Sequence, residues 1–197
     1  MTARIAVLAS GGGSNLQAIL DYHAKLGSAR SGDVILVASN RANAPALDRA
    51  RHHGIPAEYL PSPDAATLLA LLAKHSIDII VLAGYLKLVP PLVTEHYRGH
   101  IINVHPAPLP QFGGLGMYGQ RVHAAVLTAG VSHSGVTIHF VDDHFDHGSI
   151  IAHWPVPVHP DDTPETLGAR VLALEHIVYP RTVDTLAAMV MARKSIS

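Results

Sequence analysis

Asn103 and His105 stand two residues apart in a segment that begins at Ile101 and predicts a buried strand. Side chains two residues apart on an extended backbone lie on the same side, so we expect both to face one ligand. An amide donates and accepts hydrogen bonds, and an imidazole exchanges a proton near neutral pH. The prolines between residues 106 and 110 stiffen the chain that follows. This pattern suits a catalytic strand end, and it equally fits a strand that runs into a proline-rich turn with a hydrogen-bonded histidine.

A second candidate site is the segment 10–15, which reads Ser-Gly-Gly-Gly-Ser-Asn between an apolar run and a helical pattern. A strand, a glycine turn and a helix start present free backbone N–H groups and the helix dipole to an anion. Ser14 and Asn15 can add side-chain hydrogen bonds and cap the helix. A dinucleotide fingerprint would need glycine in place of Leu16, and a Walker A loop would need Lys-Ser/Thr. The segment therefore predicts a phosphomonoester site, with a tight turn that binds nothing as the alternative.

Fifteen histidines are present, and His139, His144, His147 and His153 crowd one region. Zinc sites usually show tighter ligand spacing than this group does. The acidic segment 142–148 lacks the bidentate glutamate that ends a calcium loop. We therefore expect no metal ion, and histidines that are either solvated or buried in the core.

The elements that position these residues alternate in type along the chain. Strands are expected at residues 5–9, 33–39, 57–60, 78–83, 134–141 and 149–154, and helices at 44–53, 65–75 and 120–129. Apolar strands that alternate with helices predict a parallel sheet covered by helices on both faces. Ligands on such sheets bind beyond the carboxyl ends of the strands. The loops 11–15, 84–89 and 103–110 follow strands in this way, so we expect them to converge on one site.

Two further segments carry expectations of their own. The glycine-rich segment 111–119 is expected to be mobile or to cover a ligand, with a plain irregular connection as the alternative. Thr163 is expected to cap a helix, because threonine is a favoured N-cap residue and the next residue, Pro164, is favoured at the first helical position. Pro180 is expected to break or kink that helix before a last one that ends near Met191.

Composition excludes several classes of protein. Hydrophobic residues make up 48% of the chain and charged residues 15%, which supports a sizeable core and argues against disorder. The net charge of −1 does not favour a nucleic acid or an anionic membrane as partner. The absence of cysteine excludes disulfides, thiol nucleophiles and thiolate metal sites. No signal peptide or bilayer span is expected, so the protein is expected to be cytoplasmic.

Taken together, the chain resembles the phosphoribosylglycinamide formyltransferases, the folate-dependent enzymes of purine biosynthesis. The segments that carry the resemblance are 10–17 (Ser-Gly-Gly-Gly-Ser-Asn-Leu-Gln), 82–85 (Leu-Ala-Gly-Tyr), 103–106 (Asn-Val-His-Pro), 139–146 and 175–180 (Glu-His-Ile-Val-Tyr-Pro). The resemblance implies an α/β, Rossmann-like formyltransferase fold in three layers, with a mostly parallel central sheet of about seven strands. It implies one domain over residues 1–197, with a phosphate-binding half at 1–100 and a catalytic, folate-binding half at 101–197.

The resemblance also implies a reaction, in which 10-formyltetrahydrofolate gives its formyl group to the amine of glycinamide ribonucleotide during IMP biosynthesis. The implied catalytic residues are Asn103, His105 and Asp146: the first two would donate to the oxyanion, and the Asp146 carboxylate would raise the pKa of His105. The implied ribonucleotide-binding residues are Gly12, Gly13, Ser14, Asn15 and Glu175. The implied folate-binding residues are Leu86, Lys87, Leu88, Val89, Asn103, Asp142, Asp143, His144, Phe145 and Asp146.

The chain departs from the family pattern at a few positions. His147 stands where glycine or threonine is common, Lys87 stands where arginine is frequent, and no arginine precedes the expected helix at 65–75. Three alternatives are considered. A formyltetrahydrofolate deformylase is expected to carry an extra N-terminal domain, and a methionyl-tRNA formyltransferase is expected to carry a C-terminal one. The third alternative is a non-catalytic nucleotide-binding protein on the same fold. Small-molecule substrates are the expected partners, and a monomer and a homodimer remain equally open.

Overall fold

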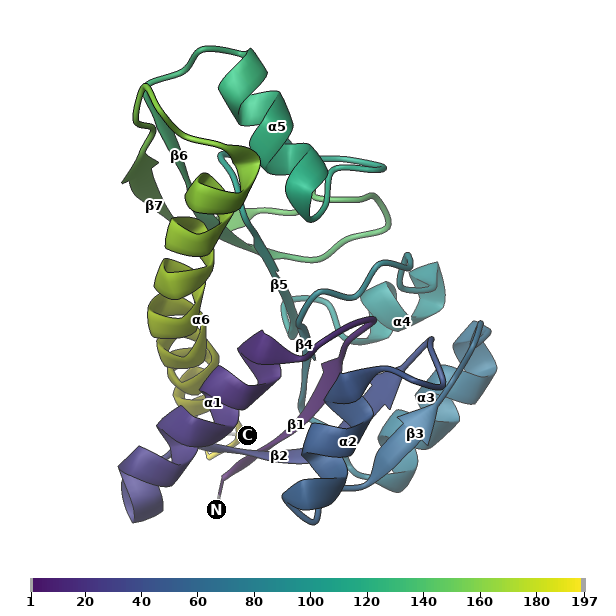
Figure 1. Ribbon diagram of the computed structural model, residues 1–197. Helices are drawn as coiled ribbons and strands as arrows, with labels where there is room; N and C mark the ends of the chain where they lie inside the picture. The colour runs from purple at the N-terminus through teal and green to yellow at the C-terminus, as the bar shows by residue number, and fades with distance from the viewer. Residues whose placement is uncertain (1, 196–197) are drawn as a thin grey trace.

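The computed structural model of the protein describes residues 2–195 and contains one seven-stranded sheet (Figure 1). The strand order is β3-β2-β1-β4-β5-β6-β7. The strands are β1 (Ala3–Leu8), β2 (Gly32–Ser39), β3 (Ala57–Tyr59), β4 (Ile79–Leu82), β5 (Ile101–His105), β6 (His133–Phe140) and β7 (Ile150–Pro157). All neighbours from β3 to β5 pair in parallel, whereas β6 and β7 pair antiparallel. The expectation of about seven strands in a mostly parallel sheet is confirmed.

Helices cover both faces of the sheet and complete the three expected layers (Figure 1). The helices are α1 (Ser14–Leu26), a 3-10 turn η1 (Gly27–Ala29), α2 (Pro45–His52), α3 (Ala65–Lys74), α4 (Pro91–His96), α5 (Gln120–Thr128) and α6 (Pro164–Lys194). Successive residues of β1 point to opposite faces, so Ile5 and Val7 join a core under α1, α2, α5 and α6. Ala6 and Leu8 join a second core under α3 and α4. Burial on both faces explains why β1 is apolar without alternation.

The expected cap of α6 is confirmed, and α3 has a side-chain cap as well. Asp64 caps α3 by accepting a hydrogen bond from the backbone N–H of Thr67 at 2.7 Å. Thr163 caps α6 by accepting from the backbone N–H of Thr166 at 3.3 Å, and the Thr166 hydroxyl accepts in return from the Thr163 backbone at 2.9 Å. This reciprocal pair is a capping box. Helix α4 was not expected from the sequence, because its six residues are too few to show a periodic pattern.

The expected division at Pro180 is wrong, because the single helix α6 runs through it from Pro164 to Lys194. A proline removes one helical hydrogen bond, which by itself disfavours the helix at that point. Here residues on both sides of Pro180 are buried, and Tyr179 at 0% exposure donates its hydroxyl to the backbone carbonyls of Leu82 at 2.8 Å and Ile102 at 3.1 Å. Tertiary packing against the sheet therefore outweighs the local preference.

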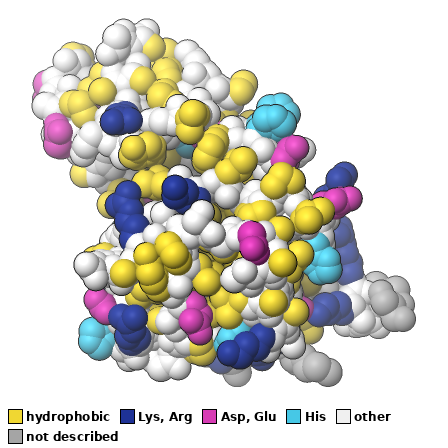
Figure 2. Space-filling view, turned by 90° about the vertical axis from the view of Figure 1, so that its right-hand side faces the viewer, with side chains coloured by type: hydrophobic (Ala, Val, Ile, Leu, Met, Phe, Trp, Pro, Cys, Tyr) yellow, Lys and Arg dark blue, Asp and Glu magenta, His cyan; other side chains and the backbone are white. Residues whose placement is uncertain are grey.

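The surface seen in Figure 2 has hydrophobic side chains through its middle, with acidic, basic and histidine side chains scattered among and around them. Charges of both signs are mixed on this face, in keeping with the small net charge of the chain. None of the helices within residues 2–195 is long and apolar enough to cross a membrane.

Candidate active site

A cavity of about 350 Å³ lies beyond the carboxyl ends of β1, β4 and β5, where the sequence predicted three loops to meet. Asn15, Leu86 and His105 line it, one from each predicted loop, together with Glu175 of α6. The glycine-rich segment 114–119 closes another side of the same cavity. The predicted convergence of the three loops is therefore confirmed, and the segment 111–119 contributes a wall of the site.

The Asp146 carboxylate lies between the predicted catalytic pair. Its Oδ2 is 3.5 Å from Nδ1 of His105, and its Oδ1 accepts a hydrogen bond from the Asn103 amide at 3.4 Å. The backbone N–H of Gly114 donates to Oδ2 at 3.0 Å. Asp146 itself has a φ of 55°, in the left-handed region that favours glycine but that aspartate tolerates better than most residues. The backbone at this point holds the carboxylate in place at some conformational cost.

The second ring nitrogen of His105, Nε2, makes a hydrogen bond of its own. Nε2–H donates to the carbonyl of Phe112 at 2.8 Å, so Nδ1 is the nitrogen that faces Asp146. Burial is the largest influence on this imidazole and lowers its pKa, although the Asp146 charge and the Phe112 carbonyl act to raise it. Asp146 acts to raise the pKa of His105, as expected, but burial outweighs this influence and the pKa lies below its ordinary value. The physical reason is that only 3% of His105 is exposed, and desolvation penalises the charged ring more than one carboxylate compensates.

Asp146 keeps its charge in this environment. Burial acts to raise its pKa, but the hydrogen bond with His139 and the charges of His105 and His139, together with the Gly114 N–H, outweigh burial, so the pKa lies below the ordinary value. An ionised carboxylate beside this imidazole can stabilise a proton on the ring during a reaction.

His139 is a member of this group that the sequence analysis did not place in the site. Its Nδ1–H donates to the carbonyl of Phe140 at 2.7 Å, and its Nε2 lies 3.1 Å from the amide nitrogen of Asn103. Nε2 also lies 3.6 Å from Oδ1 of Asp146. The available signal was the strand alternation of β6, whose residue His139 pairs directly with Asn103 of β5.

The glycine-rich loop begins α1 and brings Asn15 to Glu175. The expectation that Ser14 and Asn15 cap the helix is wrong, because Gly13 is the N-cap residue and α1 has no side-chain cap. The Asn15 amide instead donates to Oε2 of Glu175 at 2.6 Å. Burial raises the pKa of Glu175 to about 7, while the Asn15 hydrogen bond acts in the opposite direction. Gly13 has a φ of 71°, and a Cβ at this position would lie 2.8 Å from the Cβ of Ala46. Only glycine allows this approach of the loop to α2.

Arg49 of α2 supplies a positive charge next to the predicted glycine-rich loop, and this charge was not expected from the sequence. Its Nε donates to the carbonyl of Gly12 at 2.8 Å, and its Nη1 donates to Gln17 at 3.1 Å. Arg49 lines a hollow of about 400 Å³ together with Ser14, Lys25 and His176. The glycine-rich loop therefore combines the start of a helix with a neighbouring arginine, and this combination suits a phosphate group.

The residues predicted to bind folate are divided between a pair of neighbouring cavities and a separate recess. Leu86 lines the main cavity, and its backbone N–H donates to the Ser10 hydroxyl at 2.8 Å. A smaller cavity of about 50 Å³ shares Tyr85, Asn103, Phe145 and Asp146 with the main one. Its lining also includes Lys87, Leu88, Val89, His139 and His144.

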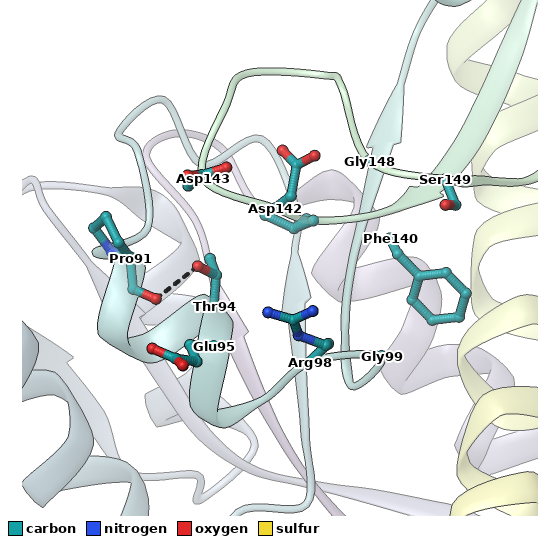
Figure 3. A pocket seen from close by; sticks show the side chains of 11 residues that line it. Pro91, Thr94, Glu95, Arg98, Gly99, Phe140, Asp142, Asp143, Gly148 and Ser149 are labelled. Atoms are coloured by element: carbon teal, nitrogen blue, oxygen red, sulfur yellow. Dashed lines mark hydrogen bonds between the residues drawn. The ribbon is translucent and has the colours of Figure 1, made fainter.

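Asp142 and Asp143 lie elsewhere. They line an open recess of about 680 Å³ between the loop that joins β6 to β7 and the C-terminal end of α4, opposite Glu95 and Arg98 (Figure 3). The predicted catalytic residues do not line this recess. The structure therefore brings eight of the ten predicted folate residues to the two connected cavities and leaves this pair outside them.

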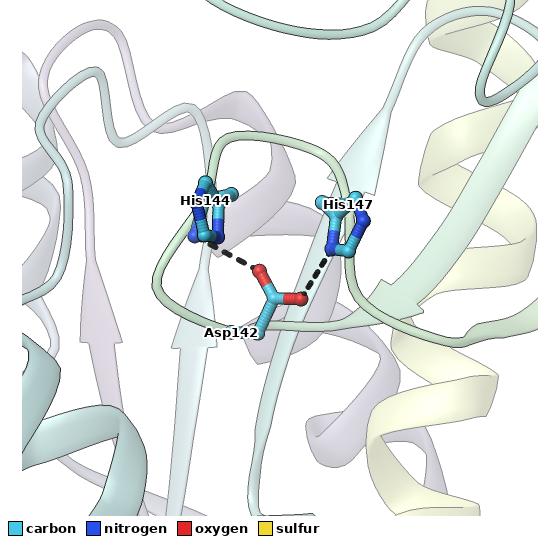
Figure 4. A group of neighbouring side chains, drawn as sticks. All are labelled: Asp142, His144 and His147. Carbon is cyan, nitrogen blue, oxygen red and sulfur yellow. Dashed lines mark hydrogen bonds and ion pairs between the residues drawn. The ribbon is translucent and has the colours of Figure 1, made fainter.

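The four crowded histidines also separate. His139 is buried beside Asp146, and His153 of β7 lies 3.0 Å from the Thr137 hydroxyl. His144 and His147 instead lie together on the exposed loop with Asp142 (Figure 4).

Comparison with known proteins shows the family. A model described as "Formyl transferase" matches residues 3–183. A chloroplastic phosphoribosylglycinamide formyltransferase from Vigna unguiculata is 41% identical over 190 residues, which cover 93% of this chain and 60% of that protein. The phosphoribosylglycinamide formyltransferase of Escherichia coli (strain K12) is 37% identical over 190 residues, which cover 93% of this chain and 86% of that protein.

A solved structure extends the likeness from sequence to fold. The phosphoribosylglycinamide formyltransferase from Coxiella burnetii has a TM-score of 0.86 and 38% identity, over 95% of this chain and 88% of that chain. The family model, the relatives and the shared three-layer fold agree. The chain therefore belongs to the phosphoribosylglycinamide formyltransferases of the formyl transferase family.

Proposed function

We propose that the protein transfers the formyl group of 10-formyltetrahydrofolate to the amine of glycinamide ribonucleotide, a step of IMP biosynthesis. The observation that carries this proposal is the Asp146 carboxylate, held between Asn103 and His105 at the floor of the main cavity. A pure binding protein does not need a buried amide, imidazole and carboxylate directed at one another. An acyl-transfer enzyme needs all three types of group.

The reaction assigns a separate task to each group. The substrate amine attacks the formyl carbon, the carbon–N10 bond of the folate breaks, and one amine proton ends on N10. The Asn103 amide donates to the oxyanion that forms between these events, a type of interaction that typically contributes about 3 kcal/mol to transition-state stabilisation. The Phe112 carbonyl holds Nε2–H of His105, so Nδ1 is the position through which this ring receives or gives the proton. The negative charge of Asp146 stabilises the imidazolium while it exists.

Substrates are proposed to enter from the two ends of the cavity. Gly12, Gly13, Ser14 and Asn15 hold the phosphate and ribose of the ribonucleotide at the start of α1, with Arg49 beside the loop. Glu175, whose carboxyl accepts a hydrogen bond from the Asn15 amide, also accepts hydrogen bonds from hydroxyl groups of the ligand. The pterin ring occupies the side formed by Leu86 to Val89 and by Phe145 and Asp146. On this assignment the phosphate-binding loop lies in residues 1–100 and the catalytic residues lie in residues 101–197. The pterin side and the ribonucleotide side of the site each use residues of both halves, which belong to one domain.

The test is an assay with purified protein, 10-formyltetrahydrofolate and glycinamide ribonucleotide, each omitted in turn. We expect tetrahydrofolate and formylated amine in equal amounts, and neither product when the amine is absent. Tetrahydrofolate and formate without amine would identify a deformylase instead. Binding of both substrates without any product would identify a non-catalytic binding protein and overturn the proposal.

A further inference from the structure

Asp142, His144 and His147 form an exposed cluster on the loop between β6 and β7 (Figure 4). The Asp142 carboxylate accepts from Nδ1 of His147 at 2.8 Å and from the backbone N–H of His144 at 2.9 Å. The two imidazole rings are 5.5 Å apart between centroids and are inclined to each other. One potential ligand atom from each residue lies within 4.8 Å of the others. This arrangement places two imidazoles and one carboxylate around a common point.

The ligand types determine which ions fit this point. Imidazole nitrogen suits zinc, nickel, cobalt and copper, whereas magnesium and calcium prefer oxygen ligands alone. Zinc binds such ligands at about 2.0–2.2 Å in a tetrahedron, so its ligand atoms lie roughly 3.3–3.5 Å apart. The side chains of His144 and His147 are 70% and 74% exposed, so they can rotate to this spacing without disturbing the core.

We propose that Asp142, His144 and His147 bind one divalent transition-metal ion of the zinc class, with water in the remaining coordination position. Of these three residues only His144 also lines the smaller cavity beside Asn103 and Asp146, and the metal site goes beyond the formyl transfer proposed above. It also gives a role to His147, which no contact with the main cavity explains. The expectation of no metal rested on spacing along the sequence, whereas the loop brings positions 142, 144 and 147 together by turning back on itself.

The experiment is a titration of the untagged full chain with Zn²⁺ against a chromophoric chelator, because a histidine tag would bind the ion itself. We expect one equivalent of zinc per chain at the tightest site, and no comparable binding of Mg²⁺. The double variant His144→Asn/His147→Asn removes two ligands and is expected to weaken zinc binding by at least about tenfold. Both side chains are exposed, so circular dichroism and the thermal midpoint should match the parent protein.

A matched control separates this site from general zinc binding by surface histidines. The double variant His52→Asn/His96→Asn removes two exposed histidines from α2 and α4 and should bind zinc as the parent does. Addition of Ni²⁺ should broaden amide resonances of residues 142–148 before those of α2 and α4, because paramagnetic broadening depends on distance. Equal zinc affinity in the parent and in His144→Asn/His147→Asn, or broadening that begins elsewhere, would show that the cluster is a hydrogen-bonded acid–base group and not a metal site.

Discussion

At the scale of single residues, Asp146 connects the groups that are proposed to carry the chemistry. One carboxylate approaches His105, Asn103 and His139, and accepts from the backbone of Gly114. These partners come from β5, β6 and the glycine-rich segment, so removal of the charge affects three elements at once. The carboxylate also provides the largest influence that raises the pKa of His105 against its burial.

Asp146→Asn keeps the shape of the side chain and removes its charge. We expect kcat for formyl transfer to fall by about 10²–10⁴, because the imidazolium formed during proton transfer loses its counter-charge. The Michaelis constants for both substrates should change much less. Loss of the raising influence should also lower the pKa of His105 further, which moves the acid limb of the pH–rate profile to lower pH.

The control for this substitution is Asp161→Asn, an exposed aspartate that precedes α6. It should leave the rate and the pH profile unchanged. A rate for Asp146→Asn within a factor of three of the parent would remove Asp146 from the mechanism and leave Asn103 to act alone.

At the scale of elements, the contact between the glycine-rich loop and α2 determines the phosphate end of the site. Gly13 has a positive φ and lies against Ala46, while the carbonyl of neighbouring Gly12 accepts from Arg49. Three features that the sequence shows separately, a glycine, a small residue on α2 and a cation one turn later, are therefore one structural unit.

Gly13→Ala is expected to strain this unit. A Cβ would contact Ala46, and the left-handed conformation costs an ordinary residue about 1–2 kcal/mol, so the free energy of unfolding should fall by roughly 1–3 kcal/mol. The Michaelis constant for the ribonucleotide should rise, because the displaced loop no longer presents its N–H groups to phosphate. Urea unfolding and initial-rate measurements test these two effects.

Gly11→Ala is the matched control, because a Cβ at Gly11 meets nothing within 4 Å and the residue has no positive φ. We expect its stability and its Michaelis constants to stay close to those of the parent. Equal behaviour of the two variants would show that the loop relaxes without strain at Gly13.

At the scale of the whole molecule, buried ionisable groups link stability to pH in two directions. Burial lowers the pKa values of His23, His105 and His123. As the pH falls to about 6.5, these histidines therefore bind protons more readily in the unfolded chain than in the folded protein. Their contribution to stability is therefore lost as the pH falls below about 6.5. Glu175 acts in the opposite direction, because its pKa rises from 4.5 to about 7 on folding. The folded state binds its proton more tightly, and the associated stability is lost as the pH rises through this range.

Glu175→Gln should remove the second effect alone. The difference in free energy of unfolding, variant minus parent, should increase by roughly 2–3 kcal/mol from pH 5 to pH 8, because only the parent must ionise a buried carboxyl as the pH rises. Urea unfolding at pH 5, 6.5 and 8 measures this difference, and Glu95→Gln, on the surface of α4, is the control. Identical pH dependence in the parent and in Glu175→Gln would show that Glu175 is not protonated in the folded protein.

Much of the architecture followed from local pattern. Runs such as residues 79–82 are apolar throughout because both faces of a central parallel strand are covered, and this property is visible without coordinates. The cap Thr163 was equally readable, since a cap bonds to the backbone of its own first turn. Pro180 could not be read correctly, because the packing that retains it in α6 comes from residues of β4 and β5 far away in sequence.

Three features could be predicted without coordinates: the alternation of strands and helices, the meeting of three loops at one edge of the sheet, and the placement of Asn103 and His105 on the same side of one strand. Each of these depends on spacing within a short segment. Tertiary packing, in contrast, lowers the pKa of His105 through burial, brings His139 next to Asp146, and places Arg49 beside the glycine-rich loop. It also brought Asp142, His144 and His147 into one cluster. Desolvation and contact between distant segments depend on what packs around a side chain, which no spacing along the chain records.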